Sequence, residues 1–149
     1  RRMLDRSFIG VEPAPRSSDV EKGQLKFFAK ATGETNPVYF DEKAARDAGH
    51  PALPAPPTFL FCLQMMAPDD DNVMETLGIN IAQVLHGEQQ FTNYKPIHAG
   101  DTVTFTRKIA DMYEKKGGAL EFIVQDTEAS NQRGEKVGVA RTIIVVRNG

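Results

Sequence analysis

The chain has 149 residues, of which 40% are hydrophobic and 26% charged, a composition typical of one soluble globular domain. Its net charge of −2, the absence of any Lys- or Arg-rich run and the absence of an apolar stretch of ~20 residues argue against nucleic acid or a membrane as a partner. The one cysteine, Cys62, cannot form an internal disulfide, so we expect a small buried side chain in a reducing, cytoplasmic setting.

The N-terminal third is predicted to form a short strand and two helices. The strand is expected near Phe8-Ile9. Ser18-Asp19-Val20-Glu21 has the form of a capping box, and apolar residues at helical spacing then predict a helix over 19–32, which Gly33 would end. A second, short helix is predicted between Asp41 as its N-cap and Gly49.

A proline-rich segment, residues 51–57, separates these helices from a third one. Its four prolines exclude regular hydrogen-bonded structure, and its apolar residues favour a packed loop. Pro57 and Thr58 are suited to opening a helix that continues through Met66. Because this helix is apolar on almost every side, we expect it to be buried. Asp69-Asp70-Asp71-Asn72 then predicts a solvated turn.

From Ile81 onward the hydrophobic period changes to two, which predicts about four long antiparallel strands with a hairpin turn at Gly117-Gly118. The strands are expected around residues 82–91, 103–109, 120–124 and 137–146. Helices followed by such a meander indicate an α+β protein. We expect one curved sheet wrapped around the buried helix, an arrangement known as the hot-dog fold.

The most informative motif is residues 28–40, which read Phe-Ala-Lys-Ala-Thr-Gly-Glu-Thr-Asn-Pro-Val-Tyr-Phe. It resembles the hydratase motif of the MaoC-like family of (R)-3-hydroxyacyl-thioester dehydratases and R-specific enoyl-CoA hydratases. In that family an aromatic residue precedes Gly-Asp-x-Asn-Pro-x-His. Gly33, Asn36 and Pro37 match the motif, and the resemblance extends over roughly residues 20–110.

The resemblance implies a single hot-dog domain over 1–149 that acts on a trans-2-enoyl thioester carried by CoA or acyl carrier protein. It implies no metal or redox cofactor. It also implies a dimer, either of two copies or of this chain with a catalytic hot-dog subunit. The chain is most similar to the N-terminal, FAS1-like type of dehydratase.

Two positions depart from the family motif, since Glu34 stands where the family has Asp and Tyr39 where it has His. Histidine titrates at roughly 6.5 and tyrosine at roughly 10, so a tyrosine is a poor base at neutral pH. One interpretation makes Glu34 a displaced general base that Asn36 orients and Tyr39 assists as a proton donor. In the other, the loop is purely structural, as in heteromeric family members where only the partner carries the Asp and His.

Two further places are candidate substrate-binding sites. The family resemblance implies that backbone amides at Pro57-Thr58-Phe59, where the third helix begins, polarise the thioester carbonyl; the alternative is a rigid helix entry. His86 lies near Glu88 and is either a substitute base or an ordinary strand residue. His50 and His98 have no obvious partners, and no metal-ligand spacing is present.

The sequence therefore supports an acyl-thioester-binding protein that hydrates enoyl thioesters alone or with a catalytic partner. The alternative is an inactive subunit that shapes the acyl tunnel of its partner. A thioesterase would need an acid or nucleophile on the third helix, where only Cys62 and Gln64 are available.

Overall fold

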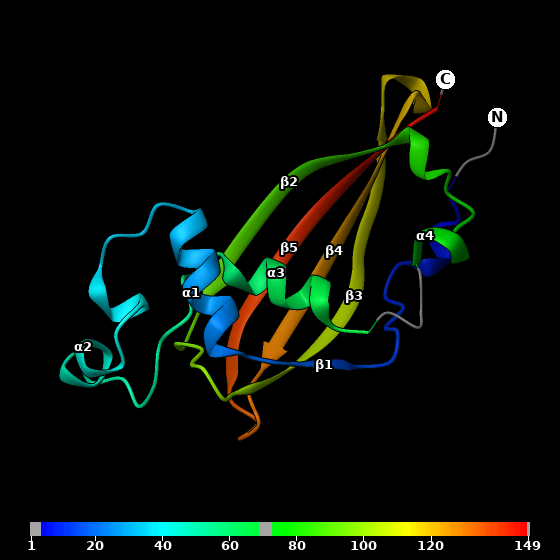
Figure 1. Ribbon diagram of the computed structural model, residues 1–149. Helices are drawn as coiled ribbons and strands as arrows, with labels where there is room; N and C mark the ends of the chain where they lie inside the picture. Colours follow the sequence, from blue (N-terminus) through cyan, green and yellow to red (C-terminus); the bar gives the residue numbers. More distant parts are fainter. Residues whose placement is uncertain (1–3, 69–72, 149) are drawn as a thin grey trace.

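The computed structural model describes residues 4–68 and 73–148, and it shows one five-stranded antiparallel sheet of order β1-β3-β4-β5-β2. The sheet is strongly curved, and helix α3 crosses its concave face (Figure 1). This arrangement confirms the expected α+β hot-dog fold. The strands are β1 (Arg16–Asp19), β2 (Val84–Asn93), β3 (Thr102–Lys115), β4 (Leu120–Ser130) and β5 (Lys136–Arg147).

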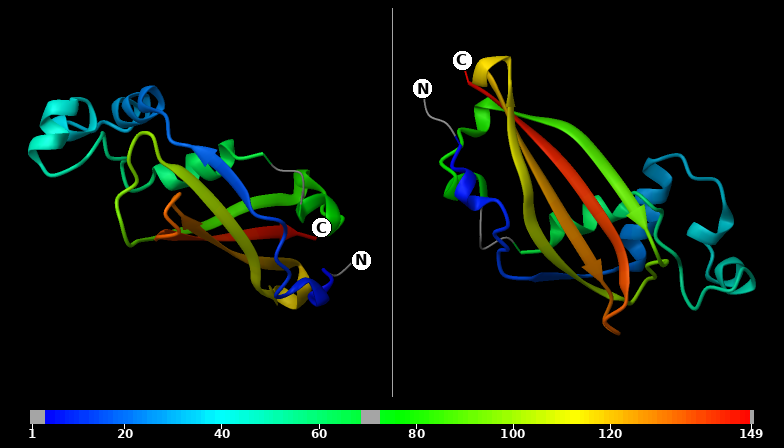
Figure 2. Two further views of the ribbon diagram at one scale, coloured as in Figure 1. Left: turned by 90° about the horizontal axis from the view of Figure 1, so that it is seen from below. Right: turned by 180° about the vertical axis from the view of Figure 1, so that it is seen from behind.

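The helices lie across the concave face of this sheet and at its two ends. α1 and α2 lie at one end of the sheet and α4 at the other (Figures 1 and 2). The helices are α1 (Lys22–Ala31), α2 (Glu42–Asp47), α3 (Phe59–Met66) and α4 (Val73–Thr76), and the 3-10 turns are Arg6–Phe8, Pro37–Tyr39, Ile81–Gln83 and Lys116–Gly118. The turn predicted at Asp69–Asn72 lies outside the described residues.

Most of the predicted helix ends are confirmed. The Asp41 carboxylate accepts a hydrogen bond from the amide of Lys43 at 3.0 Å, and Gly33 and Gly49 have φ values of +79° and +94° after their helices. The capping box was wrong. Ser18 and Asp19 belong to β1, and α1 starts three residues later than Asp19 because these residues pair with β3 instead.

The strand predicted at Phe8-Ile9 was also wrong. Arg6–Phe8 form a 3-10 turn, in which the amide of Ser7 donates to the side chain of Asp5 at 2.9 Å. The fifth strand is β1, a polar segment of four residues. Its pairing with Thr102–Phe105 uses backbone hydrogen bonds rather than an apolar face, so hydrophobic periodicity could not reveal it.

The concave side of the sheet contains two apolar clusters with polar side chains between them. One cluster surrounds α3 and includes Leu60, Leu63 and Phe105, and the other includes Ile109 and Ile123. Between them runs a row of polar side chains across four strands, which we call the polar belt. It consists of Arg107 on β3, Thr127 and Gln125 on β4, Thr142 on β5 and Gln89 on β2.

Helix α3 is less completely buried than its composition predicted. Leu60 and Leu63 are at most 2% exposed, but Met65 is 70% exposed and Met66 is 41% exposed. The helix therefore packs against the sheet along one side only, and the apolar side chains of its last turn are left exposed by residues 4–68 and 73–148.

Strand β2 forms an edge of the sheet and contains a bulge at Gly87, where the register with β5 shifts. A Cβ atom at Gly87 would lie 2.7 Å from a methyl group of Val145, so a larger residue does not fit. The bulge places His86 and Gln89, three residues apart, on the same face of the strand, where their side chains lie 3.3 Å apart.

Candidate functional site

The hydratase-motif loop is held mainly by its own backbone. Gly33 takes the left-handed conformation after α1, and the amide of Glu34 donates to the carbonyl of Ala29 at 2.9 Å. The Asn36 side chain accepts from the amide of Val38 at 3.1 Å and so caps the 3-10 turn that follows. The Asn36 oxygen is thus engaged within the loop, in the manner of a turn residue.

A cleft of about 310 Å³ lies beside this loop. Its walls are Val38, Tyr39, His50 and residues 54–57 and 93–97. The proline-rich segment is fixed because the amide of Ala55 donates to Ile97 at 2.7 Å and that of Ala99 to Leu53 at 2.9 Å. The structure therefore brings Tyr39 and Pro57 together in one cleft, whereas Glu34 and Asn36 are not among its walls.

The start of α3 lies at the edge of this cleft. Thr58 is exposed at the N-cap position, and Phe59 is buried, with its ring edge-on to Phe28 at 5.2 Å. The amide of Phe59 donates to the carbonyl of Pro56 at 2.9 Å. This amide therefore already has an acceptor within the helix entry, and a thioester carbonyl would have to compete with it.

His50 and His98 are partners, contrary to the expectation from sequence. Nδ1 of His50 lies 2.9 Å from Nε2 of His98, so one ring donates and the other accepts. The amide of His98 also donates to Asp101 at 2.9 Å. Burial, and then the neighbouring His50, hold the pKa of His98 below its usual value. The pair links the segment after α2 to the loop before β3, and His50 lines the cleft.

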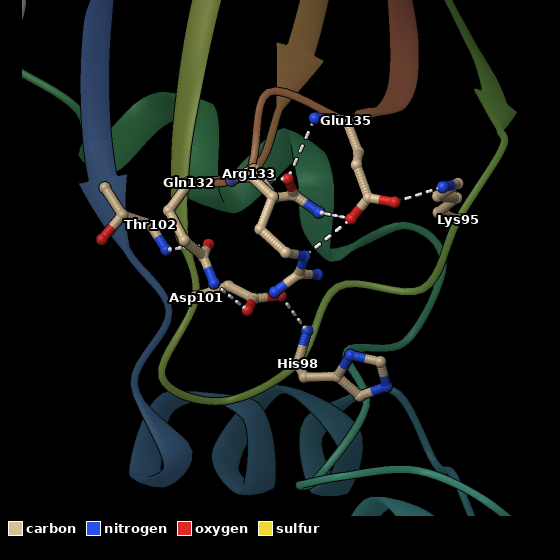
Figure 3. A network of polar contacts seen from close by, with 8 residues as sticks. Lys95, His98, Asp101, Thr102, Gln132, Arg133 and Glu135 are labelled. Atoms are coloured by element: carbon tan, nitrogen blue, oxygen red, sulfur yellow. Dashed lines mark hydrogen bonds and ion pairs between the residues drawn. The ribbon is translucent and has the colours of Figure 1, made fainter.

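A polar network continues from Asp101 to the turn between β4 and β5 (Figure 3). Gln132 donates to Asp101 at 2.9 Å and accepts from the amide of Thr102 at 3.1 Å. Glu135 contacts both Lys95 and Arg133, and hydrogen bonds from these cations and from Asn131 lower its pKa to about 2. The network fixes the outer wall of the cleft to the sheet.

His86 lies away from this cleft, on the concave side of β2. Its ring stacks on Phe61 of α3 with centroids 5.8 Å apart, and its Nε2 lies 3.3 Å from the side-chain oxygen of Gln89. The neighbouring Glu88 instead accepts from Gln90 at 3.0 Å. The structure thus does not pair His86 with Glu88, nor does it bring His86 to Tyr39.

A second cavity, of about 290 Å³, lies between the C-terminal half of α3 and the polar belt, and we call it the α3 chamber. Gln64 projects into it from α3 and donates to the hydroxyl of Thr127 at 3.0 Å. The other end of this amide, Oε1, is buried and has no partner among the described residues. Burying such a group without a partner costs about 1–3 kcal/mol.

The α3 chamber was not predicted from the sequence. One signal was present, because Gln64 is the single polar side chain in an otherwise apolar helix. A second was Arg107, which interrupts the apolar alternation of β3. Neither signal indicates a cavity without knowledge of how the helix and the sheet face each other.

Among the described residues, no three His, Cys, Asp or Glu side chains lie close enough together to hold a metal ion. The described helices also include none that is both long and apolar enough to cross a bilayer.

A curved sheet wrapped around α3, with a hydratase-type loop beside the start of that helix, defines the class of MaoC-like hot-dog dehydratases and hydratases. Within that class, the FAS1-like, dehydratase domain region family matches residues 7–139. The chain belongs to this family.

Relatives and solved structures agree with this assignment. The UPF0336 proteins of Saccharopolyspora erythraea and Streptomyces griseus are 34% and 35% identical to this chain over 97% of its length, and 92% and 95% of those proteins is covered. The HadBC (3R-hydroxyacyl-ACP dehydratase) complex of Mycobacterium tuberculosis contains a chain that is 28% identical, with a TM-score of 0.79 over 93% of this chain and 96% of that one. The ChsH1-ChsH2 complex of the same organism gives 25% identity and a TM-score of 0.75 over 92% and 89%.

Proposed function

We propose that this protein is the supporting subunit of a heteromeric dehydratase, binding acyl thioesters while a partner hot-dog chain supplies the acid and base. The reaction would be the reversible hydration of a trans-2-enoyl thioester to the (R)-3-hydroxyacyl thioester. The thioester would be carried on CoA or acyl carrier protein.

One observation carries this proposal. Of the three motif positions Glu34, Asn36 and Tyr39, Tyr39 lines the cleft, and the Asn36 oxygen is engaged by the turn that it caps. Hydration requires one group that accepts a proton from water and another that delivers a proton to the α-carbon, both within hydrogen-bond reach of the substrate. A phenol can donate but is a poor base, so the three motif positions supply at most one of the two groups to the cleft.

The solved structures support the choice of a heteromer. HadBC and ChsH1-ChsH2 are both complexes of two different chains, and this chain is similar to a member of each over more than 90% of its own length. The exposed Met65 and Met66 on α3 and the free edge position of β2 offer surfaces that a partner chain would cover.

The proposal is tested by assaying hydration of crotonyl-CoA and of a medium-chain enoyl-CoA by the purified chain. We expect no turnover by the chain alone. We expect activity when the chain is combined with a MaoC-like chain that retains the Asp and His of the motif, and we expect that activity to persist in Glu34→Ala. Glu114→Ala, which removes an exposed carboxylate at the far end of β3, is the matched control.

Turnover by the chain alone that collapses in Glu34→Ala but not in Glu114→Ala would show that Glu34 is the general base. That outcome would replace the proposal with an autonomous hydratase. A chain that stays inactive with and without intact-motif partners would also contradict it.

A further inference from the structure

We propose that the α3 chamber binds a hydroxyl group on the acyl chain of the thioester, remote from the carbonyl carbon, and that the chain therefore selects hydroxylated over plain aliphatic acyl groups. This inference rests on the proposed function, because it names the class of acyl group that the same protein would bind.

The first argument is the composition of the chamber wall. Of the ten described residues that line it, five are apolar and five polar, and the polar ones are Arg16, Gln64, Arg107, Gln125 and Thr142. A cavity built only for a hydrocarbon tail has no use for polar side chains in its wall, because each buried polar group loses its hydration without return. The polar belt places a guanidinium, two amides and two hydroxyls where the sheet faces α3.

The second argument is hydrogen bonding that the described residues leave incomplete. Gln64 is 8% exposed, and its Oε1 has no partner, whereas its amide nitrogen is held by Thr127. On the sheet side of the chamber, the Thr142 hydroxyl donates to Gln89 at 2.7 Å. That leaves the oxygen of Thr142 as an acceptor. A ligand must therefore bring a donor for Gln64, and a hydroxyl can do this whereas a methyl or a ketone cannot.

The third argument is distance along α3. Gln64 lies six residues after Thr58, at the start of the helix, where the family resemblance places the thioester. At 1.5 Å per residue this separation is about 9 Å along the helix axis. An acyl chain of medium length spans such a distance, so its far end can carry the hydroxyl that Gln64 lacks.

The test is calorimetric titration of the purified chain with butanoyl-, hexanoyl- and octanoyl-CoA and with the ω-hydroxy derivative of each. At the length that reaches Gln64, we expect the hydroxylated ester to bind about tenfold more tightly than the plain one, as one recovered hydrogen bond allows. In Gln64→Leu the two esters should bind about equally. The matched control is Gln90→Leu, which removes the same kind of side chain from the exposed face of β2, away from the chamber. This variant should keep the preference for the hydroxylated ester.

Thr142→Val is a second variant in case Gln64→Leu does not fold, and it should also reduce the preference. Equal binding of plain and hydroxylated esters by the natural chain, or a preference that survives both chamber variants, would overturn the chamber inference and leave the proposed function standing. Failure of every ester to bind, on CoA and equally on acyl carrier protein, would overturn both.

Discussion

The hydrogen bond between Gln64 and Thr127 leads to a prediction about stability. Thr127→Val should destabilise the natural chain but stabilise a chain that already carries Gln64→Leu. Thr127→Val preserves the shape of a side chain that is 1% exposed but removes the partner of the Gln64 amide. Both ends of that amide are then buried without a partner, which costs about 1–3 kcal/mol. For a domain of this length, a loss of about 2 kcal/mol lowers the melting temperature by about 4–8 °C.

The same substitution is expected to act in the opposite direction in a Gln64→Leu background. There the amide is gone, and the Thr127 hydroxyl is the buried group without a partner. Removing this hydroxyl should therefore stabilise the Gln64→Leu chain. The double variant should be more stable than the natural chain by about 1 kcal/mol, because packed carbon has replaced the unsatisfied Oε1 of Gln64. The coupling between the two positions should reach about 2 kcal/mol or more.

The natural chain, the variants Thr127→Val and Gln64→Leu, and the double variant form a double-mutant cycle. Urea unfolding of these four proteins, followed by circular dichroism, measures the coupling directly. Equal losses from Thr127→Val in both backgrounds would show that the two side chains do not interact. A double variant less stable than the natural chain would show that the free end of Gln64 is satisfied in solution, which would also remove the main support for a hydroxyl-binding chamber.

Three further predictions concern the supports of the site. Gly138→Ala should destabilise the protein by about 1–3 kcal/mol, because the added methyl would lie 3.0 Å from a backbone oxygen. Gly23→Ala, with open space around it in α1, should stabilise the protein by about 0.5–1 kcal/mol. Chemical denaturation of both variants and the natural chain measures these differences. The pKa of His98 is lowered by burial and by His50, so the unfolded chain binds a proton at this residue more readily than the folded chain does. Stability should therefore fall as the pH drops below about 6.5. His98→Gln should make stability less dependent on pH, which thermal melts across this pH range measure. Asn36→Ala should lower the melting temperature by about 2–4 °C through loss of a turn cap of about 1 kcal/mol, and Asn36→Asp, which keeps the accepting oxygen, should not.

The fold could be predicted because its long elements carry strong periodic signals. The apolar residues of α3 and the alternation in β3 and β5 identified a helix and a sheet, each with apolar surface that packing against the other would bury. β1 could not be found in this way, since its four polar residues are held by the backbone of β3. The false capping box at Ser18 has the same origin, because pairing with another strand competed with a local signal and prevailed.

The site was less accessible to sequence reasoning. The hydratase motif located the loop, but whether Asn36 faces a substrate or its own backbone is decided by the turn geometry. The contact between His50 and His98 joins residues 48 positions apart through the pairing of Pro54 with His98, which no periodicity reports. In β4, Phe122, Ile123 and Val124 are apolar in succession, so the pattern could not show which face meets α3.

The bulge at Gly87 lets β2 hold one extra residue without changing which of its side chains face α3. With this extra residue, His86 and Gln89 both face α3 even though an odd number of positions separates them. A deletion of Gly87 would restore simple alternation with His86 two positions before Gln89, so both side chains would still face α3 and only the bulge would be lost. A single deletion in the regular part of the strand, by contrast, would turn every side chain on one side of it to the opposite face of the sheet.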